Sequence, residues 1–278
     1  MPIPADAARA PGGFRSLTPI ARDAYHLQTN LPDELKWLLW QSDADREPVG
    51  AETEAQNEKE FAWAMEAAIR AYLGADKRDQ RIAYADARAD DDLFERENRF
   101  GVGLDYDARR YVESALYEAE FIRAQVGIGL DVQVDGLDVQ VGKPGGWSAA
   151  GLLKLGGEGR MAHFEALPDE KPVQTDLPAR FKVYLATPAL FKDGWRAGDW
   201  NEFFTKPVKL VAAALARYQA RGGFDLVNQD HKPSQRYVPA GSVYYFESTD
   251  GVELKKNNVT DEDANLGFGQ VLTGGWYV

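Results

Sequence analysis

The chain has few side chains suited to acid–base or nucleophilic chemistry. Its 3 histidines are His26, His163 and His231, and it has 0 cysteines. None of the histidines stands at a spacing that binds metal or forms a catalytic triad, and neither a phosphate-binding P-loop nor a dinucleotide fingerprint occurs. The missing thiolates exclude disulfides, cysteine nucleophiles and thiolate metal sites. We therefore predict a protein without catalytic activity, metal or cofactor.

Basic and aromatic residues are concentrated between residues 180 and 236. This stretch has ten basic and five acidic residues, whereas the whole chain has a net charge of −12. Lysine and arginine neutralise phosphates, and the aromatic rings between them can stack on unpaired bases. The pattern indicates binding of a single-stranded nucleic acid. The competing interpretation is that most of these aromatic side chains belong to the core and the cations to a solvated face.

Three glycine-bearing segments lie at 154–160, 185–200 and 266–278. Glycine permits positive φ and allows another backbone to come close. Such loops can therefore present N–H groups to a phosphodiester chain.

Periodicity divides the chain into residues 1–96 and 97–278. Residues 1–30 contain four prolines and no regular pattern, which predicts an irregular arm. Apolar spacing predicts a short helix over 33–41 and a longer amphipathic helix over 53–73. The charged segment 86–97 is predicted to be a linker between the two regions.

Beyond residue 98 the apolar residues alternate with polar ones. Residues 126–141 predict a β-hairpin that turns at Asp135 and Gly136, and residues 147–155 predict a helix. Further strands are predicted over 160–167, 181–188, 207–215, 241–248 and 271–278. The mixture predicts an α+β fold.

Five segments stand in the order of a known protein family. They are ENRFGVGLDYDARRYVESALYEAEFIR (97–123), KLGGEGR (154–160), LATPALFKDGW (185–195), YVPAGSVYYFE (237–247) and LGFGQVLTGGWYV (266–278). Together they resemble the RAMP superfamily of CRISPR effector proteins, and most closely the third subunits of the type III-B Cmr complex. The resemblance covers residues 97–278 and, more loosely, 16–75.

The resemblance implies a RAMP-type ferredoxin-like (RRM-like) sheet with helices and glycine-rich loops. It also implies a non-catalytic subunit that binds the 5′ handle of crRNA and docks the large cyclase-type subunit and the backbone RAMP subunit. Within it, the residues expected to contact RNA are Lys154, Gly156, Gly157, Arg160, Lys192, Trp195, Arg196, Lys232, Arg236, Gly267, Gly269 and Gly274. The residues outside 180–236 carry a net charge of −17, which suits protein neighbours better than RNA.

The front of the chain departs from this family. Neither the family's initial strand with its Arg-Asp segment nor the helix after it is recognisable. We therefore expect an incomplete N-terminal half that leaves the apolar face of the helix at 61–73 exposed.

Two other functions stay open at this point. A RAMP endoribonuclease would use His26 or His231 near the scissile phosphate. A carbohydrate- or peptide-binding module would use Trp195, Trp200 and Trp276 as a stacking platform. No apolar run is long enough for a membrane span and no secretory signal is present, so we expect a cytoplasmic protein.

Overall fold

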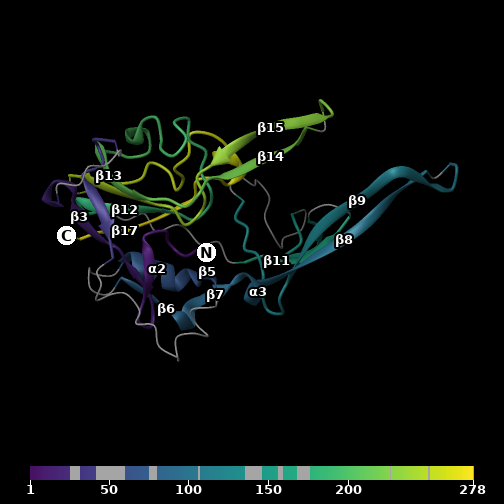
Figure 1. Cartoon of the computed structure of the whole chain (residues 1–278), viewed down its shortest axis with the longest axis horizontal. Coiled ribbons are helices and arrows are strands. Elements are labelled where there is room, and N and C mark those ends of the chain that lie inside the picture. Colours follow the sequence, from purple (N-terminus) through teal and green to yellow (C-terminus); the bar gives the residue numbers. More distant parts are fainter. Residues whose placement is uncertain are drawn as a thin grey trace. The chain divides into compact units, whose positions relative to one another are not determined.

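The computed structural model consists mostly of β-strands with few helices (Figure 1). It describes residues 1–25, 32–41, 60–74, 80–105, 107–134, 146–155, 159–167, 176–225, 227–249 and 251–277. The helices are α2 (Glu66–Gly74) and α3 (Asp90–Leu93), with 3₁₀ turns η1 (Arg22–Tyr25), η3 (Tyr84–Asp86), η4 (Trp200–Glu202) and η5 (Ala264–Leu266). No helix in these ranges has the length and hydropathy needed to cross a membrane.

A four-stranded antiparallel sheet is the centre of the fold. Its strands are β12 (Arg180–Leu185), β13 (Val208–Ala214), β16 (Val243–Ser248) and β17 (Val271–Gly275). They lie in the order β13-β16-β12-β17. All four confirm strands that the sequence predicts. Among their described residues, the connections from β12 to β13 and from β16 to β17 have the short 3₁₀ turns η4 and η5 as their helical structure.

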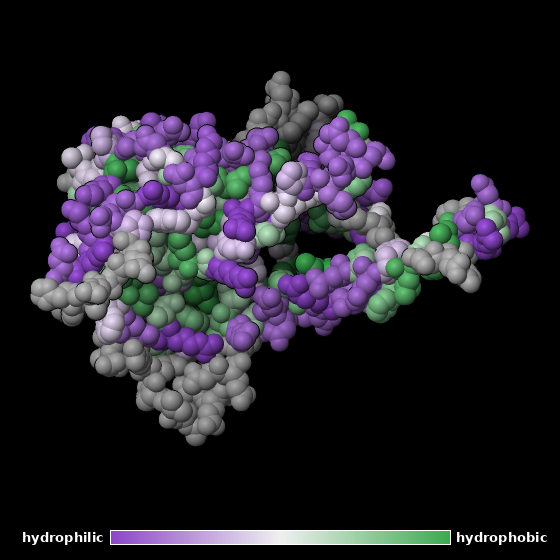
Figure 2. All heavy atoms as spheres, turned by 45° about the horizontal axis from the view of Figure 1, so that its top comes forward, coloured by the Kyte–Doolittle hydropathy of each residue, from purple (hydrophilic) through white to green (hydrophobic). Residues whose placement is uncertain are grey.

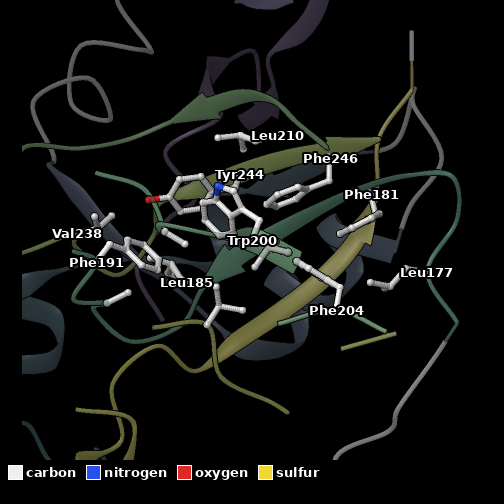
Figure 3. Packing of buried hydrophobic residues seen from close by; sticks show 14 of the residues in the cluster. Leu177, Phe181, Leu185, Phe191, Trp200, Phe204, Leu210, Val238, Tyr244 and Phe246 are labelled. Carbon is white, nitrogen blue, oxygen red and sulfur yellow. The ribbon is translucent and has the colours of Figure 1, made fainter. Parts of the chain in front are cut away.

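Both faces of the central sheet are buried. In β12 the side chains of Phe181, Val183 and Leu185 pack into one core, and the neighbouring Tyr184 packs into another. Successive strand residues point to opposite faces, so this alternation gives each face its own apolar layer. Figure 3 shows the first layer, in which Trp200 packs among the rings of neighbouring strands and loops.

The N-terminal region builds the layer on the second face. Its strands are β1 (Ala7–Ala10), β2 (Gly13–Ser16), β3 (Thr18–Ala21), β4 (Trp37–Trp40), β5 (Phe61–Ala64), β6 (Arg81–Ala83) and β7 (Ala87–Ala89). They form one three-stranded sheet, β1-β2-β6, and the pairs β3-β4 and β5-β7.

Several predictions for this region are wrong. Residues 7–21 form three short strands instead of an irregular arm. The predicted helix at 33–41 is wrong because Trp37–Trp40 pairs with β3, which places Trp37 and Leu39 against the second core. The helix predicted at 53–73 is wrong over 61–64, which form strand β5, and is confirmed from Glu66 onward as α2. Residues 53–59 lie outside the described residues.

The apolar face of α2 is covered. Ile69 and Tyr72 are 0% exposed and Leu73 is 1% exposed, and the helix packs on β17 and β6. The expectation of an exposed apolar face is therefore wrong. The chain before this helix forms strands β1 and β2, and Phe14 of β2 belongs to the same core as α2.

The charged segment predicted as a linker is regular structure. It contains β7, α3 and the start of a long hairpin made of β8 (Phe94–Asp105) and β9 (Arg110–Ala124). The predicted boundary between residues 96 and 97 falls inside β8. The structure instead forms two compact units, one of Met1–Gln125 with Gln174–Val278 and one of Val126–Val173.

The smaller unit contains a hairpin of β10 (Ala150–Lys154) and β11 (Met161–Glu165). The strand predicted at 160–167 is confirmed as β11, and the helix predicted at 147–155 is wrong because β10 pairs with it. Residues 126–134 form neither strand nor helix, so the first arm of the predicted hairpin is wrong. Its turn at Asp135 and Gly136 lies outside the described residues.

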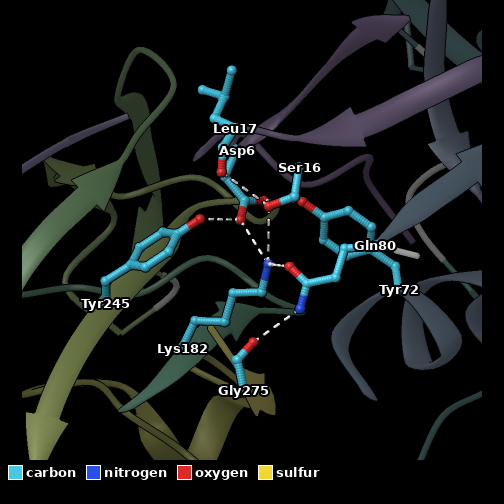
Figure 4. Close-up of polar contacts among 8 residues, drawn as sticks. All are labelled: Asp6, Ser16, Leu17, Tyr72, Gln80, Lys182, Tyr245 and Gly275. Atoms are coloured by element: carbon cyan, nitrogen blue, oxygen red, sulfur yellow. Dashed lines mark hydrogen bonds and ion pairs between the residues drawn. The ribbon is translucent and has the colours of Figure 1, made fainter. Parts of the chain in front are cut away.

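A buried ion pair joins the N-terminal segment to the central sheet. Lys182 Nζ lies 2.9 Å from Asp6 Oδ2, and both side chains are 0% exposed (Figure 4). The ammonium also donates to Gln80 Oε1 at 3.1 Å. Asp6 accepts from the hydroxyls of Tyr72 (2.8 Å) and Tyr245 (2.5 Å). Burial, followed by the charge of Asp6, raises the pKa of both phenols well above the usual value, so they stay donors.

Removing Asp6 should destabilise the fold strongly. Asp6→Ala leaves the ammonium of Lys182 buried without a counter-charge, at a cost of about 3–5 kcal/mol in the free energy of unfolding. Chemical denaturation followed by tryptophan fluorescence measures this change. The control is Glu66→Ala, which breaks the exposed Glu66–Arg70 pair and should cost about 0.5 kcal/mol or less. Equal losses in the two variants would contradict the prediction.

Candidate nucleic-acid interface

The hairpin of β14 (Gln219–Asp225) and β15 (Asp230–Tyr237) has a basic shaft. Arg221, Lys232 and Arg236 are all exposed on it. Its acidic residues, Asp225 and Asp230, form the last pair before the turn. The shaft therefore concentrates cations while the carboxylates lie at the tip.

The base of this hairpin is fastened to the glycine-bearing loop after β16. The hydroxyl of Tyr237 donates to Asp263 Oδ2 at 2.6 Å, and its ring lies 4.7 Å from that of Phe268. Desolvation, followed by this hydrogen bond and the charge of Asp263, raises the pKa of Tyr237 to about 12. The guanidinium of Arg221 lies 5.9 Å from the Phe268 ring centroid, within cation–π range.

Three segments that the sequence analysis singled out separately meet beside the hairpin. The N–H of Ala189 donates to the carbonyl of Val238 at 2.9 Å. The N–H of Gly269 donates to Pro188 at 2.8 Å, and Thr187 Oγ1 donates to the carbonyl of Gly267 at 2.8 Å. Residues 187–196 and 259–269, with the β14–β15 hairpin, therefore form one continuous surface, called here the hairpin–loop surface.

Lys192 is an exposed cation of this surface. Its N–H donates to Asp261 Oδ2 at 2.8 Å, which fixes the loop while the side chain points to solvent. Trp195 and Arg196 are half-buried. Trp195 packs against the first core, and Arg196 forms an ion pair with Glu34 and lies 5.6 Å from the Trp195 ring centroid. These two residues already have structural contacts, so Lys192 is the member of this trio that faces solvent.

The predicted glycines have local structural reasons. Gly269 has φ +73°, and a Cβ there would stand 2.7 Å from the Val259 carbonyl oxygen. A Cβ on Gly274 would stand 2.1 Å from the Leu73 carbonyl oxygen, because β17 packs directly on the end of α2. Gly267 has φ +85° with open space around it. Of the three, Gly267 is the one whose surroundings leave room for a ligand.

The remaining predicted contacts belong to the unit Val126–Val173. Lys154 ends β10 and Arg160 precedes β11, and both are exposed. The N–H of Leu155 donates to the carbonyl of Arg160 at 3.1 Å, which brings the two ends of this turn together. Gly156 and Gly157 lie outside the described residues.

Two of the three tryptophans expected to form the stacking platform of a carbohydrate- or peptide-binding module are buried. Trp200 is 8% exposed in the core of one sheet face, and Trp276 is 2% exposed in the core of the other.

Of the histidines, His231 packs edge-on against Phe224 at 5.4 Å and His163 lies in β11. His26 lies outside the described residues. Within the described ranges, no group of three or more His, Asp or Glu side chains could hold a metal ion.

Sequence reasoning missed Phe268 and Asp263 as the anchors of the hairpin. Tyr218 is one of the aromatic residues of the basic stretch but was not predicted as an RNA contact, and its ring lies 4.8 Å from the guanidinium of Arg236. The alternation of cations and aromatic rings was visible, but no local pattern says which loop a ring will meet.

Comparisons with known proteins give the following. A family model described as "CRISPR-associated protein (Cas_Cmr3)" matches residues 1–276. A search of the curated proteins finds no significant match. Among solved structures, one titled "Cryo-EM structure of the Type III-B Cmr-beta bound to cognate target RNA" is 17% identical and covers 66% of this chain and 57% of that chain, with a TM-score of 0.38.

A second structure, of the same complex with target RNA and AMPPnP, is 19% identical and covers 66% of this chain and 59% of that chain, with a TM-score of 0.38. The chain therefore spans less than two thirds of the solved chains that it matches. At these TM-scores the structural likeness informs neither the fold nor the site.

The raised pKa of Tyr237 predicts a weaker alkaline sensitivity in Tyr237→Phe. The folded phenol ionises near pH 12, above the usual value near 10, so its contribution is complete below pH 10 and is lost between pH 10 and 12. Between pH 10 and 12 the free energy of unfolding should fall more steeply with pH in the wild type than in Tyr237→Phe. The two slopes should differ by at most about 1.4 kcal/mol per pH unit. Urea denaturation at pH 9 to 12 measures the slopes, with the exposed Tyr218→Phe as control. Equal slopes for wild type and Tyr237→Phe would contradict this.

Proposed function

Because the chain belongs to the CRISPR-associated Cas_Cmr3 family, we propose that it is a non-catalytic subunit of a type III-B CRISPR effector complex that binds the 5′ handle of crRNA. The observation that carries the proposal is the hairpin–loop surface, where a basic hairpin shaft is fastened to loops from two other parts of the chain.

The surface supplies the groups that single-stranded RNA needs. Lys192, Lys232 and Arg236 are exposed cations that can contact phosphates and position the strand. The ring of Tyr218 lies next to Arg236 and the ring of Phe268 next to Arg221, and unpaired bases stack on such rings. Around Gly267 the open space lets a sugar–phosphate backbone approach the loop.

The strand order supports a ferredoxin-like assignment for the central sheet. A ferredoxin-like βαββαβ unit has four antiparallel strands in the order 4-1-3-2. Counted along the chain, β12, β13, β16 and β17 lie in the same order, read from β17 to β13. The crossovers here are loops with 3₁₀ turns where that unit has helices. Those loops are the ones that form part of the hairpin–loop surface.

The family implies assembly with other Cmr subunits, and the charge distribution is compatible with such neighbours. The stretch 180–236 carries the excess of cations, while the rest of the chain is acidic. Opposite charge steers association, so the acidic remainder suits basic protein neighbours. We assign these neighbours to the large cyclase-type subunit and the backbone RAMP subunit.

Replacing Lys232 and Arg236 together with alanine should weaken binding of crRNA. Each phosphate contact that is lost should flatten the slope of log affinity against log salt by about one unit. Fluorescence anisotropy with labelled crRNA at a series of salt concentrations measures both quantities. Arg70→Ala, in α2 on the opposite side of the central sheet, is the control and should change neither. An unchanged affinity and slope in the double variant would remove this surface from the RNA contacts.

Trp195→Ala separates stacking from packing in the same assay. Because the indole packs against the first core, its removal should lower the melting temperature. A loss of RNA affinity with an unchanged melting temperature would instead assign the ring to a base.

A subunit without catalytic function should leave crRNA intact. Labelled precursor crRNA incubated with the purified chain should keep its length on a denaturing gel, because acid–base cleavage needs a pair of groups poised at the phosphate. Cleavage that disappears in His231→Ala would support the endoribonuclease alternative.

A further inference from the structure

The β8–β9 hairpin has one face with exposed apolar side chains, which no described residue of its own unit covers. The two strands pair only with each other and form a two-stranded sheet of 12 and 15 residues. In the register Val102 pairs with Leu116 and Phe100 with Glu118. Directly paired residues of an antiparallel ladder share a face, so Phe100, Val102 and Leu116 lie side by side. Phe100 is 72% exposed and Leu116 71%. Apolar surface on this arm is visible in Figure 2.

The other face of the same hairpin is occupied by its own contacts. Glu97 accepts hydrogen bonds from Arg99 at 2.7 Å and from Arg123 at 3.0 Å. The guanidinium of Arg99 lies 5.3 Å from the ring centroid of Phe121. Tyr117 lies across Gly101, where a Cβ would meet its ring. The two faces therefore differ, because one is paired internally and the other presents apolar side chains to water.

The charges on the apolar face suit a protein better than RNA. Glu118 and Glu120 lie on it, and Arg96 is the only cation among the described residues of that face from 94 to 102 and 116 to 124. Arg96 is already held by Glu120 at 2.7 Å. Over 94–124 the chain has seven acidic and five basic residues, so phosphates would be repelled.

We propose that the face formed by Phe100, Val102 and Leu116 docks onto a neighbouring protein subunit that presents an apolar patch flanked by lysine or arginine. This inference rests on the proposed function, which places the chain in a multi-subunit complex. A two-stranded hairpin is marginally stable alone in water, so covering this face stabilises the arm as well as the complex. Exposed aromatic and aliphatic clusters with a charged rim are typical of docking surfaces.

The test measures binding of the full chain to three purified partners. Biolayer interferometry measures its affinity for the large cyclase-type subunit and, separately, for the backbone RAMP subunit. Fluorescence anisotropy measures its affinity for labelled crRNA. Phe100→Ser/Leu116→Ser should weaken binding of at least one subunit about tenfold or more. Glu118→Lys should also weaken that subunit, because it places a cation against a basic rim. Tyr117→Ser, next to Leu116 but on the opposite face, is the matched control and should bind as the wild type does.

The outcomes separate this inference from the proposed function. If the wild-type chain binds crRNA and both subunits, and the hairpin variants bind them equally well, the docking face is overturned and the proposed function stands. If Phe100→Ser/Leu116→Ser weakens crRNA and Glu118→Lys strengthens it, the face belongs to RNA and the inference is also overturned. A wild-type chain that binds neither crRNA nor a subunit contradicts the proposed function itself. Melting curves show that the variants are folded, since these side chains are outside the core.

Discussion

The buried pair of Lys182 and Asp6 is the constraint on which the arrangement of the larger unit depends. A charge at the centre of a sheet face costs several kcal/mol unless a counter-charge and hydrogen bonds meet it. Lys182 stands in β12, and Asp6, Ser16, Gln80 and Tyr72 come from the N-terminal region. The N-terminal segment must therefore lie on this face of the sheet, in one register, for the lysine to be neutralised. The ion pair therefore fixes the position of the N-terminal layer, whose other contacts with the sheet are mostly apolar.

With both sheet faces covered, the functional groups are displaced to loops and hairpins. One face is filled by the N-terminal strands and α2, and the other by loops that carry Phe191, Trp200 and Phe204 into the first core. The same loops continue into the hairpin–loop surface. Packing of Phe191 and Trp200 thus fixes the loop in which Lys192 reaches solvent. In the loop before β17, Gly269 has no room for a Cβ, and its N–H donates to the carbonyl of Pro188. This hydrogen bond joins that loop to the loop after β12.

The sequence predicts correctly those strands whose own residue pattern is enough to show that they are buried. β12 and β16 are continuous apolar runs typical of strands buried on both faces, and they were found with correct bounds to within a few residues. The short apolar run Trp37–Trp40 fits a helix and a strand equally well. Its pairing with β3 decides that it forms a strand. Within the site, Lys192, Lys232 and Arg236 were predictable as exposed cations. The anchors Asp263 and Phe268 were not, because their partners are distant in sequence.

The two projecting hairpins show why a period of two does not by itself report burial. In β8, Phe100, Val102 and Leu104 stand at every second position, as in a strand with one face on a core, yet all three are exposed. β14 and β15 extend in the same way with cations in place of aliphatic side chains. The same local geometry therefore presents two surfaces of different chemistry. In the functions that we propose, the basic hairpin binds a phosphate chain and the other hairpin an apolar protein surface. The two proposals differ because of side-chain type, since the backbone geometry of the two arms is the same.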